Sequence, residues 1–336
     1  MSEDRTLPSP LFDAEVNRAI QEALPEVVLD SLSLVTHLGD GVTLVALAVL
    51  LYWFGEEEDR HKRAMILAIA VATLALVAGL KGIFEVTRPV MIADPPLPYG
   101  PQDYGGFATP SAHAMGAAAI YGSLAVVMKS GERWQRYLIA GTIIVLVCFS
   151  RVAIGVHYVG DVITGALLGV GLVYIGVRLS RDSITPVFLL SLLIAVGGYL
   201  LGSGEFTTMA IGASLGGLVV WWNVEDLSAR PHAGSIILLG ILIFPLLLFL
   251  RALQWLVSIE GHIELAGTYT IGFLSIIETT GYAVAFGGAI LVPFLAVTLN
   301  DTPAARRIYV LSPFTGRTLD PDAAGERITV TEQEEF

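Results

Sequence analysis

Three short strings of polar residues interrupt a very apolar chain of 336 residues. The first runs from Lys81 to Pro89 (KGIFEVTRP), the second is Pro110–His113 (PSAH), and the third is Ser150–Asp161 (SRVAIGVHYVGD). Together they place a lysine, two arginines, a serine and two histidines at the ends of hydrophobic segments. These side chains are the ones needed to hold a phosphate group and to transfer it through a histidine.

The cationic residues of the three strings fit the oxygens of a phosphate. Phosphoryl transfer requires positive or N–H donors around these oxygens, because charge spreads over them in the transition state. Arg88 and Arg151 carry planar guanidinium groups suited to phosphate, and Lys81 adds a point charge. Ser111 can donate its hydroxyl, and the backbone N–H groups near Ala112, at the start of a predicted helix, form an anion site.

The two histidines and the aspartate provide the reacting groups. His157 and Asp161 are four residues apart, so on a helix they share a face. A carboxylate in that place can hold one ring nitrogen and leave the other free to attack phosphorus. His113 can then protonate the departing alkoxide as a general acid.

The set of strings resembles the signature of the type 2 phosphatidic acid phosphatases, a family that shares its fold with the vanadium haloperoxidases. The family pattern is Lys-x6-Arg-Pro, then Pro-Ser-Gly-His, then Ser-Arg-x5-His-x3-Asp, and this sequence departs from it only at Ala112, where glycine is usual. The resemblance covers roughly residues 34–181. It implies that His157 forms a phosphohistidine, that Asp161 orients it and that His113 is the acid. By resemblance the phosphate-binding residues are Lys81, Arg88, Ser111, Ala112 and Arg151. The resemblance implies no metal ion and no cofactor.

The composition predicts an all-α polytopic membrane protein. Hydrophobic residues make up 54% of the chain, charged residues 15%, and the mean hydropathy is +0.70. The apolar runs predict about nine transmembrane helices. The resemblance implies that the first five form a helical-bundle phosphatase core. The predicted spans are 32–54, 64–87, 111–129, 136–153, 158–178, 184–202, 207–223, 232–257 and 270–299.

Four regions follow from this pattern. Residues 1–31 are predicted to form an N-terminal surface segment, with an amphipathic helix at 13–24 and no cleavable signal peptide. Residues 32–181 hold all three motifs, residues 182–300 add helices of unassigned role, and residues 301–336 form a polar cytoplasmic tail. The glycines of 212–218 (GASLGGL) are interpreted as close helix packing.

Basic residues occupy every second connection between the predicted spans. They cluster at 55–63, 129–136, 178–183, 223–231 and in the tail. The positive-inside rule therefore places these connections and the C-terminus in the cytoplasm of a cell-membrane protein. The three motifs then meet on the outer side.

The predicted function is that of a membrane lipid phosphatase. By resemblance the candidate substrates are phosphatidic acid, phosphatidylglycerol phosphate and a polyprenyl diphosphate, and the sequence does not choose among them. Net charge is −12 and the sequence pI is about 4.9, which argues against a nucleic-acid partner. One alternative is a phosphotransferase, in which an alcohol captures the phosphohistidine on the same site. The other is a non-catalytic lipid-binding or transport protein, against which the intact His157, Asp161 and His113 argue. The sequence leaves the oligomeric state open.

Overall fold

The computed structural model describes residues 7, 9–55, 57–101, 104–201, 206–243, 269–311 and 329–330. Most of this part of the chain is helical, which confirms the predicted all-α class. The helices of the first half are α1 (Ala14–Ala23), α2 (Glu26–Val35), α3 (Gly41–Trp53), α4 (Arg60–Phe84), α5 (Pro89–Ile92), α6 (Ala112–Val127), α7 (Arg133–Ala153) and α8 (Val159–Leu179). The second half contains α9 (Thr185–Leu201), α10 (Thr207–Val224), the helix Ala233–Ile243, α12 (Tyr269–Ala296) and α13 (Pro303–Leu311).

Short elements join or end these helices. The 3₁₀ turns are η1 (Pro10–Phe12), η2 (Thr36–Gly39), η3 (Glu57–Asp59) and η4 (Val297–Leu299). Strands β1 (Leu227–Ser228) and β2 (Thr329–Val330) form a two-residue antiparallel pair.

The helices have the length and composition of membrane spans. Among the described residues, four stretches are long and apolar enough to cross a bilayer, and the pair formed by residues 26–39 and 41–53 adds a fifth if it is counted as one broken span. The four are Arg60–Ile92, Arg133–Ala153, Val159–Leu179 and Glu278–Leu299. Leu138, Leu167 and Leu200 are among the large apolar side chains exposed on the outer faces, where lipid replaces water. The chain is therefore a multi-pass membrane protein.

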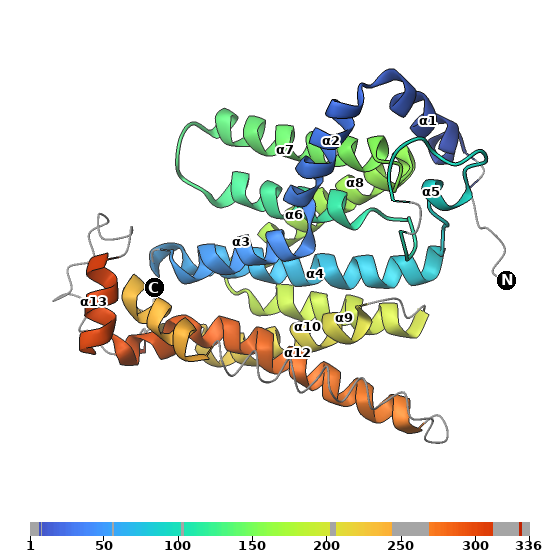
Figure 1. Cartoon of the computed structure of the whole chain (residues 1–336). Helices are drawn as coiled ribbons and strands as arrows, with labels where there is room; N and C mark the ends of the chain where they lie inside the picture. Colours follow the sequence, from blue (N-terminus) through green and yellow to red (C-terminus); the bar gives the residue numbers. More distant parts are fainter. Residues whose placement is uncertain are drawn as a thin grey trace.

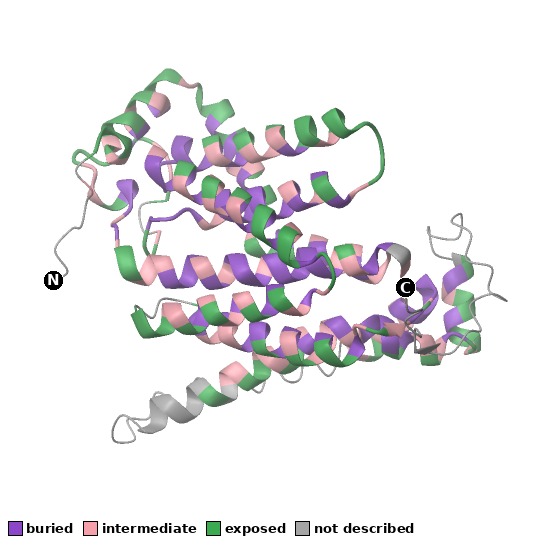
Figure 2. Cartoon of the chain, turned by 180° about the vertical axis from the view of Figure 1, so that it is seen from behind, coloured by how far each residue is buried: buried purple, intermediate pink, exposed green. Residues whose placement is uncertain are grey.

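Helix α4 lies between two helical layers (Figure 1). Helices α6, α7 and α8 lie on one side of it, α9, α10 and α12 lie on the other, and α3 lies level with α4. Buried residues run along the length of α4, whereas the outer helices bury one face each (Figure 2). Many of the buried residues of α4 and α6 are alanines, so the helix backbones approach closely.

Small residues hold α8 against α6, the helix that begins at the second motif. A Cβ atom added to Gly165 would lie 2.6 Å from the carbonyl oxygen of Ser111, and one added to Gly169 would lie 2.5 Å from that of Met115. In the second half, a Cβ atom at Gly216 would lie 2.1 Å from the carbonyl oxygen of Ala283 on α12. The interpretation of residues 212–218 as a close-packing surface is thus confirmed.

The observed helices refine the predicted spans. The predicted span 32–54 is bent by 46° between Gly39 and Gly41, at the polar residues that interrupt its hydrophobic run. Helix α2 also begins at Glu26, inside the predicted surface segment. Residues 244–268 of the predicted span 232–257 and its following loop, together with most of the tail, lie outside the described residues. The count of nine spans stays a prediction.

Basic connections gather at one end of the bundle, away from the motifs. Lys129, after α6, lies 3.0 Å from the Asp59 carboxylate before α4. Arg230, after α10, pairs with Glu57 at the same end. The structure therefore confirms that these connections, which are far apart in sequence, share one side of the molecule.

Candidate active site

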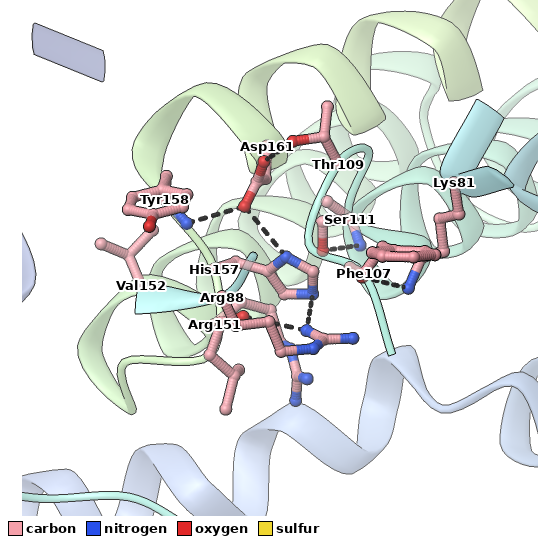
Figure 3. A network of polar contacts seen from close by, with 12 residues as sticks. Lys81, Arg88, Phe107, Thr109, Ser111, Arg151, Val152, His157, Tyr158 and Asp161 are labelled. Carbon is pink, nitrogen blue, oxygen red and sulfur yellow. Dashed lines mark hydrogen bonds and ion pairs between the residues drawn. The ribbon is translucent and has the colours of Figure 1, made fainter. Parts of the chain in front are cut away.

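His157 and Asp161 meet at the junction of α7 and α8. His157 lies in the loop between these helices, and Asp161 lies in the first turn of α8. The His157 Nδ1 atom is 3.2 Å from Asp161 Oδ2, and both side chains are buried (Figure 3). The Tyr158 amide donates to the same oxygen at 2.8 Å, and the Thr109 hydroxyl donates to the other. The carboxylate is thus fixed, and it leaves Nε2 of His157 as the nitrogen available for attack.

Arg88 contacts that second nitrogen. Its Nη1 atom lies 3.1 Å from His157 Nε2 and donates to the Val156 carbonyl at 2.9 Å (Figure 3). Burial, followed by the charges of Arg88 and Arg151, holds the pKa of His157 well below its usual range. The imidazole is therefore neutral at neutral pH, as a nucleophile must be.

A four-residue loop, Tyr104–Phe107, covers the three cationic side chains. Arg88 Nε donates to the carbonyls of Gly105 and Gly106, each at 3.1 Å, and Lys81 Nζ donates to that of Phe107 at 2.9 Å. The loop carbonyls therefore accept hydrogen bonds from the N–H groups that are predicted to bind phosphate oxygens.

Tyr104 connects the two arginines. Its ring lies 4.7 Å from the Arg88 guanidinium carbon and 5.5 Å from that of Arg151. Arg151 Nη2 donates to the Tyr104 hydroxyl at 3.0 Å, and Nη1 donates to the Thr36 hydroxyl at 2.8 Å. Arg88 and Arg151 are both almost completely buried, so their charges act in a medium of low polarity.

The second motif begins α6 beside this cluster. Ser111 is the N-cap residue, its hydroxyl accepts from the Ala114 amide at 3.4 Å, and its own amide donates to the Asp161 carbonyl at 3.1 Å. Ala112 is the first helical residue, and its φ angle is not positive. The methyl group of alanine is therefore compatible with the backbone conformation at the place where the family pattern has glycine.

His113 is held from outside the motifs. Its Nε2 atom lies 2.7 Å from Asp40 Oδ1, and the other carboxylate oxygen lies 2.6 Å from His37 Nδ1. The polar break at residues 37–41 is the sequence signal for this contact, although nothing in the sequence points to His113 as the partner.

Sequence reasoning missed a second group of residues, on α1. Asn17 Nδ2 donates to the carbonyls of Val152 and His157, at 2.8 and 3.0 Å. Gln21 Nε2 donates to the Ala153 carbonyl at 2.9 Å. The predicted amphipathic helix is confirmed, but its inner face carries two buried amides that hold the loop of His157. The hydrophobic pattern gives no signal for them, because it assigns polar residues of an amphipathic helix to the solvent face.

The comparisons with known proteins agree with the motifs. The PAP2 superfamily matches residues 62–185, a stretch that includes all the predicted site residues. This stretch, somewhat over a third of the chain, is what resembles the PAP2 superfamily. Residues 17, 21, 37 and 40, which contact the site, lie before the matched stretch.

Relatives of the PAP2 core carry names of lipid phosphatases. Phosphatidylglycerophosphatase B of Bacillus subtilis (strain 168) is 41% identical over 75 residues, which are 20% of this chain and 37% of that protein. Sphingosine-1-phosphate phosphatase 1 of Rattus norvegicus is 35% identical over 109 residues, which are 30% of this chain and 25% of that protein. The matches thus span well under half of either relative.

One solved structure is similar as well. It is the crystal structure of a transmembrane PAP2-type phosphatidylglycerolphosphate phosphatase from Bacillus subtilis. Its sequence is 26% identical, the match covers 50% of this chain and 84% of that chain, and the TM-score is 0.42.

Proposed function

We propose that this protein is a membrane lipid phosphatase that removes a terminal phosphate from a lipid through a phosphohistidine. The observation that carries the proposal is the buried pair of His157 and Asp161, with Arg88 within hydrogen-bond distance of the second ring nitrogen of His157. A binding protein needs cations for phosphate, but it needs neither an oriented imidazole nor an acid. The names of the relatives support a lipid phosphate as substrate.

The reaction proceeds in two balanced steps. In the first, His157 Nε2 bonds to phosphorus as the bond from phosphorus to the lipid oxygen breaks, and the proton of His113 goes to that oxygen to give the lipid alcohol. In the second, a water oxygen attacks phosphorus, its proton goes to His113, and the bond from phosphorus to nitrogen breaks. Asp161 stabilises the charge that develops on His157 in the first step.

The phosphate must displace the Tyr104–Phe107 loop from the cations. Arg88, Arg151 and Lys81 then turn their N–H groups from the loop oxygens to phosphate oxygens. Ser111 and the amide of Ala112 add donors from the start of α6. These charges perform the electrostatic role that a metal ion has in other phosphatases, so we propose that turnover needs no metal.

The main experiment measures phosphate release by the purified protein in detergent or lipid. The substrate panel contains phosphatidic acid, phosphatidylglycerol phosphate, sphingosine 1-phosphate and a polyprenyl diphosphate, each with and without EDTA. Release from at least one of them supports the proposal, and release from none of them refutes it. Acceptor alcohols in a parallel series distinguish transfer from hydrolysis, because a phosphotransferase would give a phosphorylated alcohol.

We also propose that the active site faces the outside of the cell membrane, because the basic connections lie at the opposite end of the bundle. Single cysteines can replace Asp94 and Ser130, which are exposed at the two ends, in a Cys148→Ala background. An impermeant thiol reagent should label the cysteine at position 94 in intact cells. The cysteine at position 130 should react only after the membrane is opened, and the reverse pattern would place the site in the cytoplasm.

A further inference from the structure

The turn at residues 36–40 is built into the active site although it precedes the part of the chain that matches the PAP2 superfamily. It consists of η2 and Asp40, and it joins α2 to α3 at the bend of the first span. The Thr36 hydroxyl accepts from Arg151, and the Leu38 carbonyl accepts from the Tyr121 hydroxyl on α6 at 2.9 Å. The turn is therefore attached both to a predicted phosphate ligand and to the helix of His113.

The fit of this turn against His113 is close. A Cβ atom added to Gly39 would lie 3.1 Å from His113 Cβ and 2.6 Å from Val147 Cγ1, so glycine is the residue that lets the backbone pass here. The next residue, Asp40, then reaches His113 Nε2 at 2.7 Å. Gly39 thus leaves room for the His113 side chain, and the adjacent Asp40 provides the carboxylate that contacts it.

We propose that Asp40 is the positioning residue of the general acid, and that it does for His113 what Asp161 does for His157. The inference rests on the function proposed above. With Nε2 held by the carboxylate, Nδ1 of His113 is left for the leaving oxygen. The negative charge of Asp40 favours the protonated imidazole, which is needed before the first step and is formed again in the second.

His37 supports this arrangement from the solvent side. Its Nδ1 atom contacts the second oxygen of Asp40 at 2.6 Å, and its side chain is 64% exposed, whereas that of His113 is 16% exposed. The carboxylate is therefore held between two imidazoles, of which only the inner one lies at the site. His37 orients Asp40, so its replacement should have a smaller effect than the replacement of Asp40.

The demand for an acid depends on the leaving group, and this dependence separates a role in proton transfer from a role in folding. A lipid alcohol leaves as a strongly basic alkoxide unless it is protonated. A nitrophenol leaves as a stable phenolate and needs little help from an acid. Loss of the general acid therefore lowers kcat/KM for the alkyl phosphate and changes kcat/KM for the aryl phosphate little. A misfolded site lowers kcat/KM for both substrates.

The experiment compares Asp40→Asn with the wild type on a lipid phosphate and on nitrophenyl phosphate. The quantity compared is kcat/KM, which reports the steps up to formation of the phosphohistidine and excludes its hydrolysis, in which His113 takes part with both substrates. We expect kcat/KM to fall about 10- to 100-fold on the lipid and to change little on the aryl ester, because positioning of a general acid matters only where protonation of the leaving group limits the rate. In a His113→Ala background, Asp40→Asn should cause no further loss. Asp30→Asn is the matched control, since it removes the same charge from α2 and its amide can still accept from the Tyr99 hydroxyl.

Each outcome has a distinct meaning. Equal loss on both substrates, or additive loss with His113→Ala, would overturn the role of Asp40 and leave the phosphatase proposal intact. A wild-type protein that releases phosphate from neither substrate would overturn the proposed function and this inference with it. A loss with Asp30→Asn as large as that with Asp40→Asn would show a general effect of charge and would also refute the inference.

Discussion

Replacement of Asn17 by alanine should impair catalysis although this residue touches no substrate. Asn17 is fully buried on α1, and its amide donates to the carbonyls of Val152 and His157. In the variant, the Val152 carbonyl keeps the Gly155 amide as a donor, whereas the His157 carbonyl loses the amide of Asn17. A buried acceptor without its partner costs about 1–3 kcal/mol, so we expect the free energy of unfolding to fall by about 1–3 kcal/mol in the variant.

The effect on rate follows from the position of the nucleophile. A displacement of a reacting group by about 1 Å can cost on the order of a hundredfold in rate. We therefore expect kcat for phosphate release to fall by about tenfold to a hundredfold in Asn17→Ala, with a smaller change in KM. The assay is steady-state phosphate release at a temperature below the unfolding midpoint of the variant, so that the folded protein is compared.

The control is Glu22→Ala, which changes an exposed side chain of the same helix. It should retain the kcat of the wild type, because Glu22 lies on the solvent side of α1. If Asn17→Ala retains wild-type kcat as well, the hydrogen bonds from α1 to the loop of His157 have no functional role, and the reasoning from buried hydrogen bonds is wrong.

Three further predictions follow from the site. Asp161→Asn should lower kcat about a hundredfold or more while vanadate affinity changes much less, and equal losses in both would make Asp161 structural. Turnover should survive EDTA and vanadate should inhibit it, since Arg88, Arg151 and Lys81 form the electrostatic clamp; complete loss in EDTA that Mg²⁺ or Zn²⁺ restores would contradict this. Ala112→Gly should leave phosphate release within severalfold of the wild type, because φ at this residue is not positive, and a large gain would show that alanine compromises the site.

The sequence predicted well the features that depend on local pattern. The apolar runs predicted α7 and α8 to within a few residues of their observed ends. The polar residues of the third motif separate the two runs, so they mark where α7 ends and α8 begins. The four-residue spacing of His157 and Asp161 predicted their contact, because it falls within one turn of chain. The polar break at Gly39 and Asp40 appeared in the sequence as an interruption of the first span and in the structure as a bend.

Contacts between distant segments could not be predicted in the same way. Asp40 and His113 are separated by 73 residues, and their pairing depends on how the broken first span packs against α6. Asn17 and Gln21 are polar residues on an amphipathic helix, and hydrophobic pattern alone assigns such residues to the solvent face. They are buried because the loop after α7 presents carbonyls that need donors, which is a property of the tertiary structure.

The central claim is that His157 becomes phosphorylated during turnover. The direct measurement is rapid quenching of the enzyme with a ³²P-labelled lipid phosphate, followed by peptide mapping of the acid-labile, alkali-stable label that is typical of phosphohistidine. We expect the label on His157 in the wild type and no label in His157→Ala, which should also release no phosphate while still binding vanadate. A label on another residue, or phosphate release by His157→Ala at a rate comparable to the wild type, would contradict the account.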